Sequence, residues 1–145
     1  QKDSARGPIL KKVERYGLDD HVEFLGHVPN EQMPDYYNLS DIVTIPTYHS
    51  EGSSIACIEA LACGKPLVVT DVGGLKELVY QGETDGGLKV KPTPAALATA
   101  LRRLIDDPGF RERLGRNARD RAEDYYTIER WEEQMRTYFD RVTGV

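Results

Sequence analysis

The sequence predicts an α/β domain in which a parallel β-sheet is flanked by helices. Three observations predict this class. Short runs of β-branched and other apolar residues recur at 42–45, 67–70 and 88–90. Segments with helical periodicity separate and follow these runs, and short turns rich in glycine and proline join the two kinds of segment. Strands that alternate with helices in this way form parallel sheets with helices on both faces, and we expect one domain over residues 1–145.

The first forty residues predict a helix, a short strand and a second helix. Apolar residues recur at helical spacing from 9 to 16, and Gly17 is a typical end signal for that helix. A strand-like run follows at 22–25. Asn30 is suited to cap a short helix at 31–39.

Five elements are expected in the middle of the chain. The run at 42–45 has no polar alternation, which is typical of a strand buried on both faces. We expect a helix from about 54 to 62, a second buried strand at 67–70, a short helix at 75–80 and a third strand at 88–90.

The C-terminal part is predicted to be helical over about residues 94–142. Its first helix begins at Thr93 or Pro94 and runs to Asp106, and Pro108 is suited to the first turn of the next helix. A last, amphipathic helix carries the apolar residues Ile128, Trp131, Met135, Tyr138 and Phe139.

Composition narrows the classes of function. The formal net charge is −5 and the basic residues at 111–121 are interleaved with acids, which predicts a solvated helix face and argues against nucleic acid as a partner. No apolar run approaches the ~20 residues of a membrane span. Cys57 and Cys63 lie about 240° apart around a helix axis, so we expect free thiols and a reducing, cytoplasmic location. The sequence gathers no further ligands for a metal.

Ligands of parallel sheets bind outside the carboxyl ends of the strands. The loops that follow those ends begin after Gly26, Ile45 and Thr70. The loop after Ile45 leads into the helix at 54–62 through the small residues Gly52, Ser53 and Ser54. Small residues let a ligand approach the backbone, and Ser53 or Ser54 is suited to cap the helix. The free N–H groups of a helix start favour a phosphate there.

Two glutamates accompany this loop. Glu59 lies about one turn inside the helix, on a stripe shared with Ile55 and Ala62 that we expect to be largely buried. Its carboxylate needs a partner, because an unpaired buried charge is costly. The hydroxyls of a ribose would serve, and so would a lysine, an arginine or water. Glu51 precedes the helix and is either a ligand group or a solvated loop acid.

A second glycine-rich loop, 71–77, follows the strand at 67–70 and also meets a helix start. The pair Gly73-Gly74 alone is more typical of a tight turn than of a ligand site. Its place on the same sheet edge as the first loop favours a shared ligand site.

The order and spacing of these motifs resemble the C-terminal domain of the retaining glycosyltransferases of family 4, which have the GT-B fold. The resemblance rests on Glu51 and Glu59 with seven residues between them, on the segments 60–66 and 70–78 that follow, and on 22–28 upstream. It covers nearly the whole chain. It implies a Rossmann-like parallel sheet with flanking helices, the C-terminal half of a GT-B fold, truncated at its N-terminal edge.

The resemblance also implies roles for individual residues. Glu59 would bind the ribose hydroxyls of the nucleotide, and Glu51, the catalytic candidate, would orient the donor sugar. The segment Gly52, Ser53, Ser54 and Ile55 would offer backbone N–H groups to sugar and diphosphate, and Val28 would lie against the base. His49 adjoins the loop and is either a sugar contact or an ordinary loop residue. Many members have an aromatic residue and a glycine where this chain has Ser53 and Ser54.

The implied function is the transfer of a hexose-type sugar from a nucleotide diphosphate sugar to an acceptor hydroxyl, with retention and without a metal or another cofactor. The chain has no Asp-x-Asp motif. The resemblance implies that the N-terminal acceptor domain and the basic diphosphate ligands of the family lie outside this chain. We therefore expect this chain alone to bind donor weakly and to transfer nothing. Further expected partners are a membrane-surface acceptor, reached through the parent protein, and a second copy at an exposed sheet edge. A non-catalytic nucleotide-binding or interaction domain is the alternative.

Overall fold

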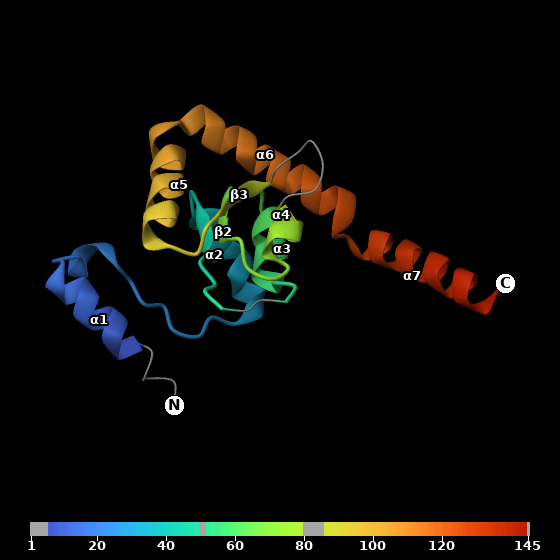
Figure 1. Ribbon diagram of the computed structural model, residues 1–145, viewed down its shortest axis with the longest axis horizontal. Helices are drawn as coiled ribbons and strands as arrows, with labels where there is room; N and C mark the ends of the chain where they lie inside the picture. Colours follow the sequence, from blue (N-terminus) through green and yellow to red (C-terminus); the bar gives the residue numbers. More distant parts are fainter. Residues whose placement is uncertain (1–5, 50–51, 80–85, 145) are drawn as a thin grey trace. The chain divides into compact units, whose positions relative to one another are not determined.

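The structure, a computed structural model, describes residues 6–49, 52–79 and 86–144 (Figure 1). The chain divides into two compact units, Gln1–Asn30 and Glu31–Val145. Each unit is packed within itself, and the single domain expected over residues 1–145 stays a prediction.

The first unit contains helix α1 (Arg6–Arg15) and the 3₁₀ turn η1 (Asp19–His21). Gly17 ends α1 in the left-handed region, with φ +61°, as its place in the sequence predicts. The strand expected at 22–25 does not form, so this prediction was wrong. Extended backbone becomes a strand only when a neighbour accepts and donates its hydrogen bonds, and no strand of the described residues pairs with this segment.

The second unit is built on a parallel sheet of β1 (Val43–Ile45), β2 (Leu67–Thr70) and β3 (Gly87–Val90), in the order β1-β2-β3. Every residue of the central strand β2 is buried. The expectation that 42–45 is buried on both faces was wrong, because Thr44 is exposed and its two neighbours in β1 are half-buried. Among the described strands, β1 pairs on one side alone, with β2, and an edge position leaves it more accessible.

The remaining helices follow the predicted order. They are η2 (Asn30–Gln32), α2 (Met33–Leu39), α3 (Ile55–Ala62), α4 (Leu75–Val79), α5 (Pro94–Asp106), α6 (Pro108–Tyr125) and α7 (Ile128–Thr143). Side-chain oxygens cap the last three, since Thr93, Asp107 and Thr127 accept hydrogen bonds from the N–H groups three residues further on. None of the helices in the described ranges is long and apolar enough to cross a membrane.

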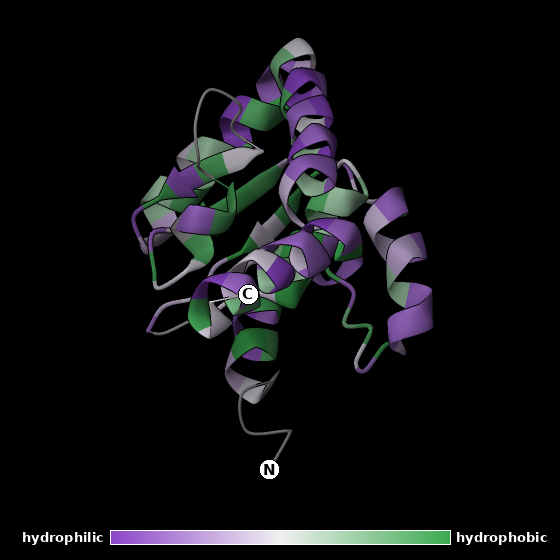
Figure 2. Ribbon diagram, turned by 90° about the vertical axis from the view of Figure 1, so that its right-hand side faces the viewer, coloured by the Kyte–Doolittle hydropathy of each residue, from purple (hydrophilic) through white to green (hydrophobic). Residues whose placement is uncertain are grey.

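Two apolar clusters cover the two faces of the sheet. Leu67 and Val69 face a cluster that includes α2, α3, α4 and the second half of α6. Val68 faces α5 and the first half of α6. Figure 1 shows α5 and the pair α3 and α4 on opposite sides of β2, and Figure 2 shows apolar colouring on strands of the sheet and on parts of the surrounding helices. The predicted α/β class, with helices on both faces of a parallel sheet, is confirmed.

Helix α6 approaches the turn after α3 very closely. A Cβ placed on Gly115 would lie 2.7 Å from the carbonyl oxygen of Gly64, so only a glycine permits this separation. Helix α7 is amphipathic as expected, but most of its large apolar side chains, Trp131 among them, are more than half exposed, whereas Met135 is half-buried.

Candidate functional site

The loops after β1 and β2 leave the same edge of the sheet, since parallel strands present their carboxyl ends together. Thr70, at the end of β2, is 1% exposed, and its hydroxyl donates a hydrogen bond to the carbonyl oxygen of Thr47 at 2.6 Å. The buried hydroxyl therefore ties the first loop to the neighbouring strand just where that loop begins.

The two loops also touch through their glycines. A Cβ placed on Gly74 would lie 2.7 Å from the carbonyl oxygen of Gly52 and 3.9 Å from the backbone nitrogen of Ser53. The absence of a side chain at Gly74, rather than an unusual backbone angle, permits this approach, because the left-handed glycine of the pair is Gly73, with φ +55°. The second loop therefore packs directly against the backbone of the first loop.

Helix α3 begins at the carboxyl edge with Ser54 at its N-cap position. The Ser54 side chain makes no capping hydrogen bond, so the expected capping by a serine hydroxyl was wrong; the Ser54 carbonyl accepts instead from the N–H groups of Cys57 and Ile58. Gly52, Ser53 and Ile55 are exposed. The geometry of a helix start directs the first N–H groups outward, toward the space beside these residues.

Glu59 has a partner that the sequence did not indicate. The hydroxyl of Tyr37, in α2, donates a hydrogen bond to Glu59 Oε2 at 3.0 Å. Tyr37 is 6% exposed and Glu59 is half-buried. The stripe that we expected to be buried is not, because Ile55 is 71% exposed and the buried face of α3 consists of Cys57, Ala60 and Leu61. Glu59 therefore lies at the boundary between core and solvent.

Tyr37 remains a donor over a wide range of pH. Burial, together with the hydrogen bond and the charge of Glu59, raises the pKa of its hydroxyl from 10.0 to about 12. A neutral donor orients the carboxylate without cancelling its charge, which a lysine or an arginine would do. The carboxylate remains available to accept hydrogen bonds from hydroxyl groups of a ligand.

The other predicted site residues are placed less completely. Glu51, the catalytic candidate, lies outside the described residues. His49 is exposed and stacks edge-on against Tyr48, with 4.8 Å between the ring centroids. Val28 is half-buried and belongs to the first unit, whereas the loops belong to the second, so its role at the base stays a prediction. In the second unit, the structure gathers Gly52, Ser53, Ser54, Ile55 and Glu59 around the start of α3.

Arg121 is a residue whose place the sequence analysis missed. It was expected on a solvated face of the basic region, but it is 0% exposed. Its guanidinium donates to the carbonyl oxygens of Glu77 and Leu78, at the end of α4. The sequence does contain a signal for this burial, because Arg121 continues the buried stripe of Leu114 and Ala118 at helical spacing.

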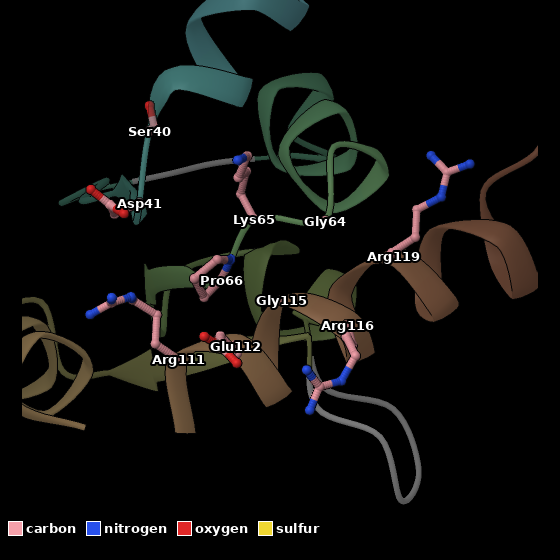
Figure 3. Close-up of a pocket in the computed structure, with 10 residues that line it drawn as sticks. All are labelled: Ser40, Asp41, Gly64, Lys65, Pro66, Arg111, Glu112, Gly115, Arg116 and Arg119. Carbon is pink, nitrogen blue, oxygen red and sulfur yellow. The ribbon is translucent and has the colours of Figure 1, made fainter. Parts of the chain in front are cut away.

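A basic cavity of about 510 Å³ lies near the opposite edge of the sheet. Figure 3 shows the residues that line it, among them Asp41 and Pro66, which precede β1 and β2. Lys65 donates to the carbonyl oxygen of Asn38 at 3.0 Å, and Arg119 pairs with Glu123 at 2.7 Å. Because these cations are held by the protein's own acceptors and point in different directions (Figure 3), the carboxyl edge is the better ligand site.

No three residues of the metal-binding types cluster within the described part of the chain. Within the part of the chain that the structure describes, no disulfide joins Cys57 and Cys63, as expected. At the carboxyl edge, the carboxylate of Glu59 can accept hydrogen bonds from hydroxyl groups of a ligand. The N–H groups at the start of α3 can bind an anion.

Comparisons with known proteins identify the family of this chain. A family model described as "Glycosyl transferases group 1" matches residues 6–121. D-inositol 3-phosphate glycosyltransferase of Kineococcus radiotolerans is 35% identical over 120 residues, which are 78% of this chain and 27% of that protein. The chain spans between 24% and 29% of the length of such curated relatives.

Solved structures share the fold. Sucrose-phosphate synthase of Thermosynechococcus elongatus matches with a TM-score of 0.83 and 34% identity, over 97% of this chain and 35% of that one. HepE of Anabaena, solved in complex with UDP, matches with a TM-score of 0.85 and 25% identity, over 97% of this chain and 37% of that one. A further structure of HepE contains UDP-glucose. With a family model matching most of its residues, this chain belongs to the glycosyl transferases of group 1.

Proposed function

We propose that this chain is the donor-binding part of a glycosyltransferase that moves a hexose-type sugar from a nucleoside diphosphate sugar to an acceptor hydroxyl, with retention. The observation that carries the proposal is the carboxylate of Glu59, held by Tyr37 one turn inside a helix whose start faces the carboxyl edge of a parallel sheet. The complexes of HepE with UDP and UDP-glucose support this choice of ligand class.

Each part of the site has a chemical task in this proposal. Glu59 accepts hydrogen bonds from the ribose hydroxyls, and the negative charge that it keeps strengthens those bonds. The N–H groups from Gly52 to Ile55 bind the diphosphate and stabilise the charge that develops on it as the sugar leaves. Glu51 orients the sugar ring, and transfer needs no metal.

The remainder of the machinery belongs to the parent protein. The basic groups that neutralise the diphosphate and the residues that bind the acceptor are assigned to segments outside this chain, which spans about a quarter of its curated relatives. We therefore propose that this chain alone binds the donor weakly and transfers no sugar.

Substitution of Glu59 tests the ribose assignment. Glu59→Gln keeps the size of the side chain and removes its charge, so the affinity of the chain for UDP-glucose, ADP-glucose or GDP-mannose should fall about 5- to 100-fold, as for the loss of a charge-assisted hydrogen bond. Isothermal titration of all three nucleotide sugars gives the dissociation constants. Glu132→Gln, an exposed change on α7, is the matched control and should bind like the wild type. Equal affinity of Glu59→Gln and wild type for every donor bound would refute the assignment.

A further inference from the structure

Arg121 joins α6 to the end of α4. It is 0% exposed, and its guanidinium donates to the carbonyl oxygens of Leu78 and, at 2.8 Å, of Glu77. A buried cation is costly unless its donors are satisfied, so these bonds fix its position. The carbonyl oxygens at the end of a helix have no partner within that helix, and Arg121 supplies one.

Tyr126 reinforces the same contact. Its hydroxyl donates to the carbonyl oxygen of Leu78 at 3.1 Å and accepts from Arg121 Nη2 at 3.3 Å. Tyr126 directly follows α6 and precedes Thr127, the residue that caps α7. The junction between α6 and α7 is therefore hydrogen-bonded to the end of α4.

The N-terminal end of α4 lies against the loop after β1. Gly74 directly precedes α4, and it approaches Gly52 so closely that a Cβ would lie 2.7 Å from the Gly52 carbonyl oxygen. Helix α4 has five residues, too few to be a stable helix alone, so its position depends on what holds it. A movement of its end at Leu78 would reach Gly74 across a segment only about 6 Å long.

A cavity of about 410 Å³ lies between the same groups. Its lining comes from the two loops, from α4 and from the region where α6 meets α7: Ser53, Gly74, Glu77, Leu78, Tyr125, Tyr126 and Gln134. The α6–α7 junction therefore borders the same cavity as the loops after β1 and β2, in addition to its hydrogen bonds to the end of α4.

From these contacts we infer that Arg121 and Tyr126 are positioning residues of the donor site. They hold the end of α4, α4 holds Gly74 against Gly52, and the backbone N–H groups from Gly52 to Ile55 keep the spacing that a sugar diphosphate requires. This inference rests on the proposed function, and it adds that donor affinity depends on two side chains of α6 and of its junction with α7.

A pair of neighbouring tyrosines provides the test. Tyr126→Phe removes the hydroxyl that bonds to Leu78 and keeps the ring. Tyr125→Phe is the matched control, because Tyr125 lines the same cavity and its hydroxyl makes no hydrogen bond within the described residues. Titration with UDP-glucose, ADP-glucose and GDP-mannose should show about fivefold weaker binding for Tyr126→Phe than for Tyr125→Phe, the effect of one lost hydrogen bond.

A spectroscopic readout separates positioning from general stability. In the free chain, the amide NMR resonances of Ser53 and Gly74 should shift in Tyr126→Phe and not in Tyr125→Phe, at temperatures where both are fully folded. Arg121→Lys keeps the charge but cannot bridge two carbonyl oxygens with a rigid fork, so it should shift the same resonances and weaken binding at least as much. If a variant is folded but shows either no shift of these resonances or no loss of affinity, the inference is wrong.

The outcomes also distinguish this inference from the function on which it rests. If Glu59→Gln loses affinity while Tyr126→Phe binds like Tyr125→Phe, the donor site stands and the positioning role is wrong. If Glu59→Gln binds like the wild type, the ribose assignment is wrong, and the amide shifts of Ser53 and Gly74 still report whether Tyr126 sets the geometry of the loops.

Discussion

The hydroxyl of Tyr37 donates a hydrogen bond to Oε2 of Glu59 at 3.0 Å and so connects α2 to the helix that starts at the donor loop. The two residues lie 22 positions apart in the sequence. The bond selects one orientation of a half-buried carboxylate whose counterpart in the proposed complex is a ribose. If Glu59 binds the ribose as proposed, the affinity of the site depends on a side chain that itself need not touch the ligand.

Tyr37→Phe should weaken donor binding about fivefold, because the Glu59 carboxylate loses its orienting donor while the ring continues to fill the core. Dissociation constants for UDP-glucose, ADP-glucose and GDP-mannose measure the effect. Tyr36→Phe changes the adjacent residue of the same helix and should leave them unaltered. Identical affinities of the two variants would show that Glu59 is oriented by other contacts.

The same tyrosine gives stability a dependence on alkaline pH. The folded-state pKa of Tyr37 is about 12, above its ordinary 10.0, so its contribution to stability is complete below pH 10 and is lost as the pH rises toward 12. The unfolded chain releases this proton first, which favours unfolding. Urea titrations across this range should show a smaller loss of unfolding free energy in Tyr37→Phe than in the wild type, and parallel losses would contradict the assignment.

Gly115→Ala should destabilise the fold by about 1–3 kcal/mol, because its Cβ would lie 2.7 Å from the carbonyl oxygen of Gly64 and would force α6 away from the turn after α3. Gly109→Ala, in the first turn of the same helix, is the control. Its Cβ would meet nothing closer than 3.6 Å, so the change should be neutral or stabilise by up to about 1 kcal/mol. Chemical denaturation measures both, and equal effects would mean that α6 moves freely.

Gly74→Ala should reduce donor affinity more than it reduces stability. The added methyl group collides with backbone, the carbonyl of Gly52, so the first loop must move outward and its N–H groups lose their spacing. A titration with the same nucleotide sugars and a thermal melt on one preparation separate the two effects. Gly7→Ala, whose Cβ meets nothing within 4 Å, should change neither by a comparable amount. Unchanged binding in a folded Gly74→Ala protein would show that the loop contact is irrelevant to the ligand.

The fold was predictable wherever local pattern and long-range packing agree. The three described strands and the helices from α2 to α7 lie close to their expected ranges, because apolar periodicity reflects which face each element buries. The strand predicted at 22–25 does not form. Its residues suit a strand, but strand formation depends on a pairing partner, which the sequence pattern does not reveal. The exposure of Thr44 likewise depends on the place of β1 in the sheet, a tertiary fact.

The loops of the candidate site could be predicted from the sequence, but the residues that hold those loops and Glu59 in place could not. Glycines and serines beside a helix start are visible in the sequence, whereas the partner of Glu59 is brought from α2 by the fold. Arg121 was misplaced because a charged residue among other charges is usually solvated. Its burial follows from two carbonyl oxygens on a different helix, more than 40 positions away, at Glu77 and Leu78.

The close approach of Gly52 and Gly74 divides the loops into positions that tolerate redesign and positions that do not. Ser53 and Ile55 are exposed, so a mutant library can vary both without disturbing the core. Position 74 has no room for a methyl group. In a directed-evolution experiment for a new donor sugar, we therefore expect selected substitutions to accumulate at 53 and 55, while every replacement at 74 is eliminated.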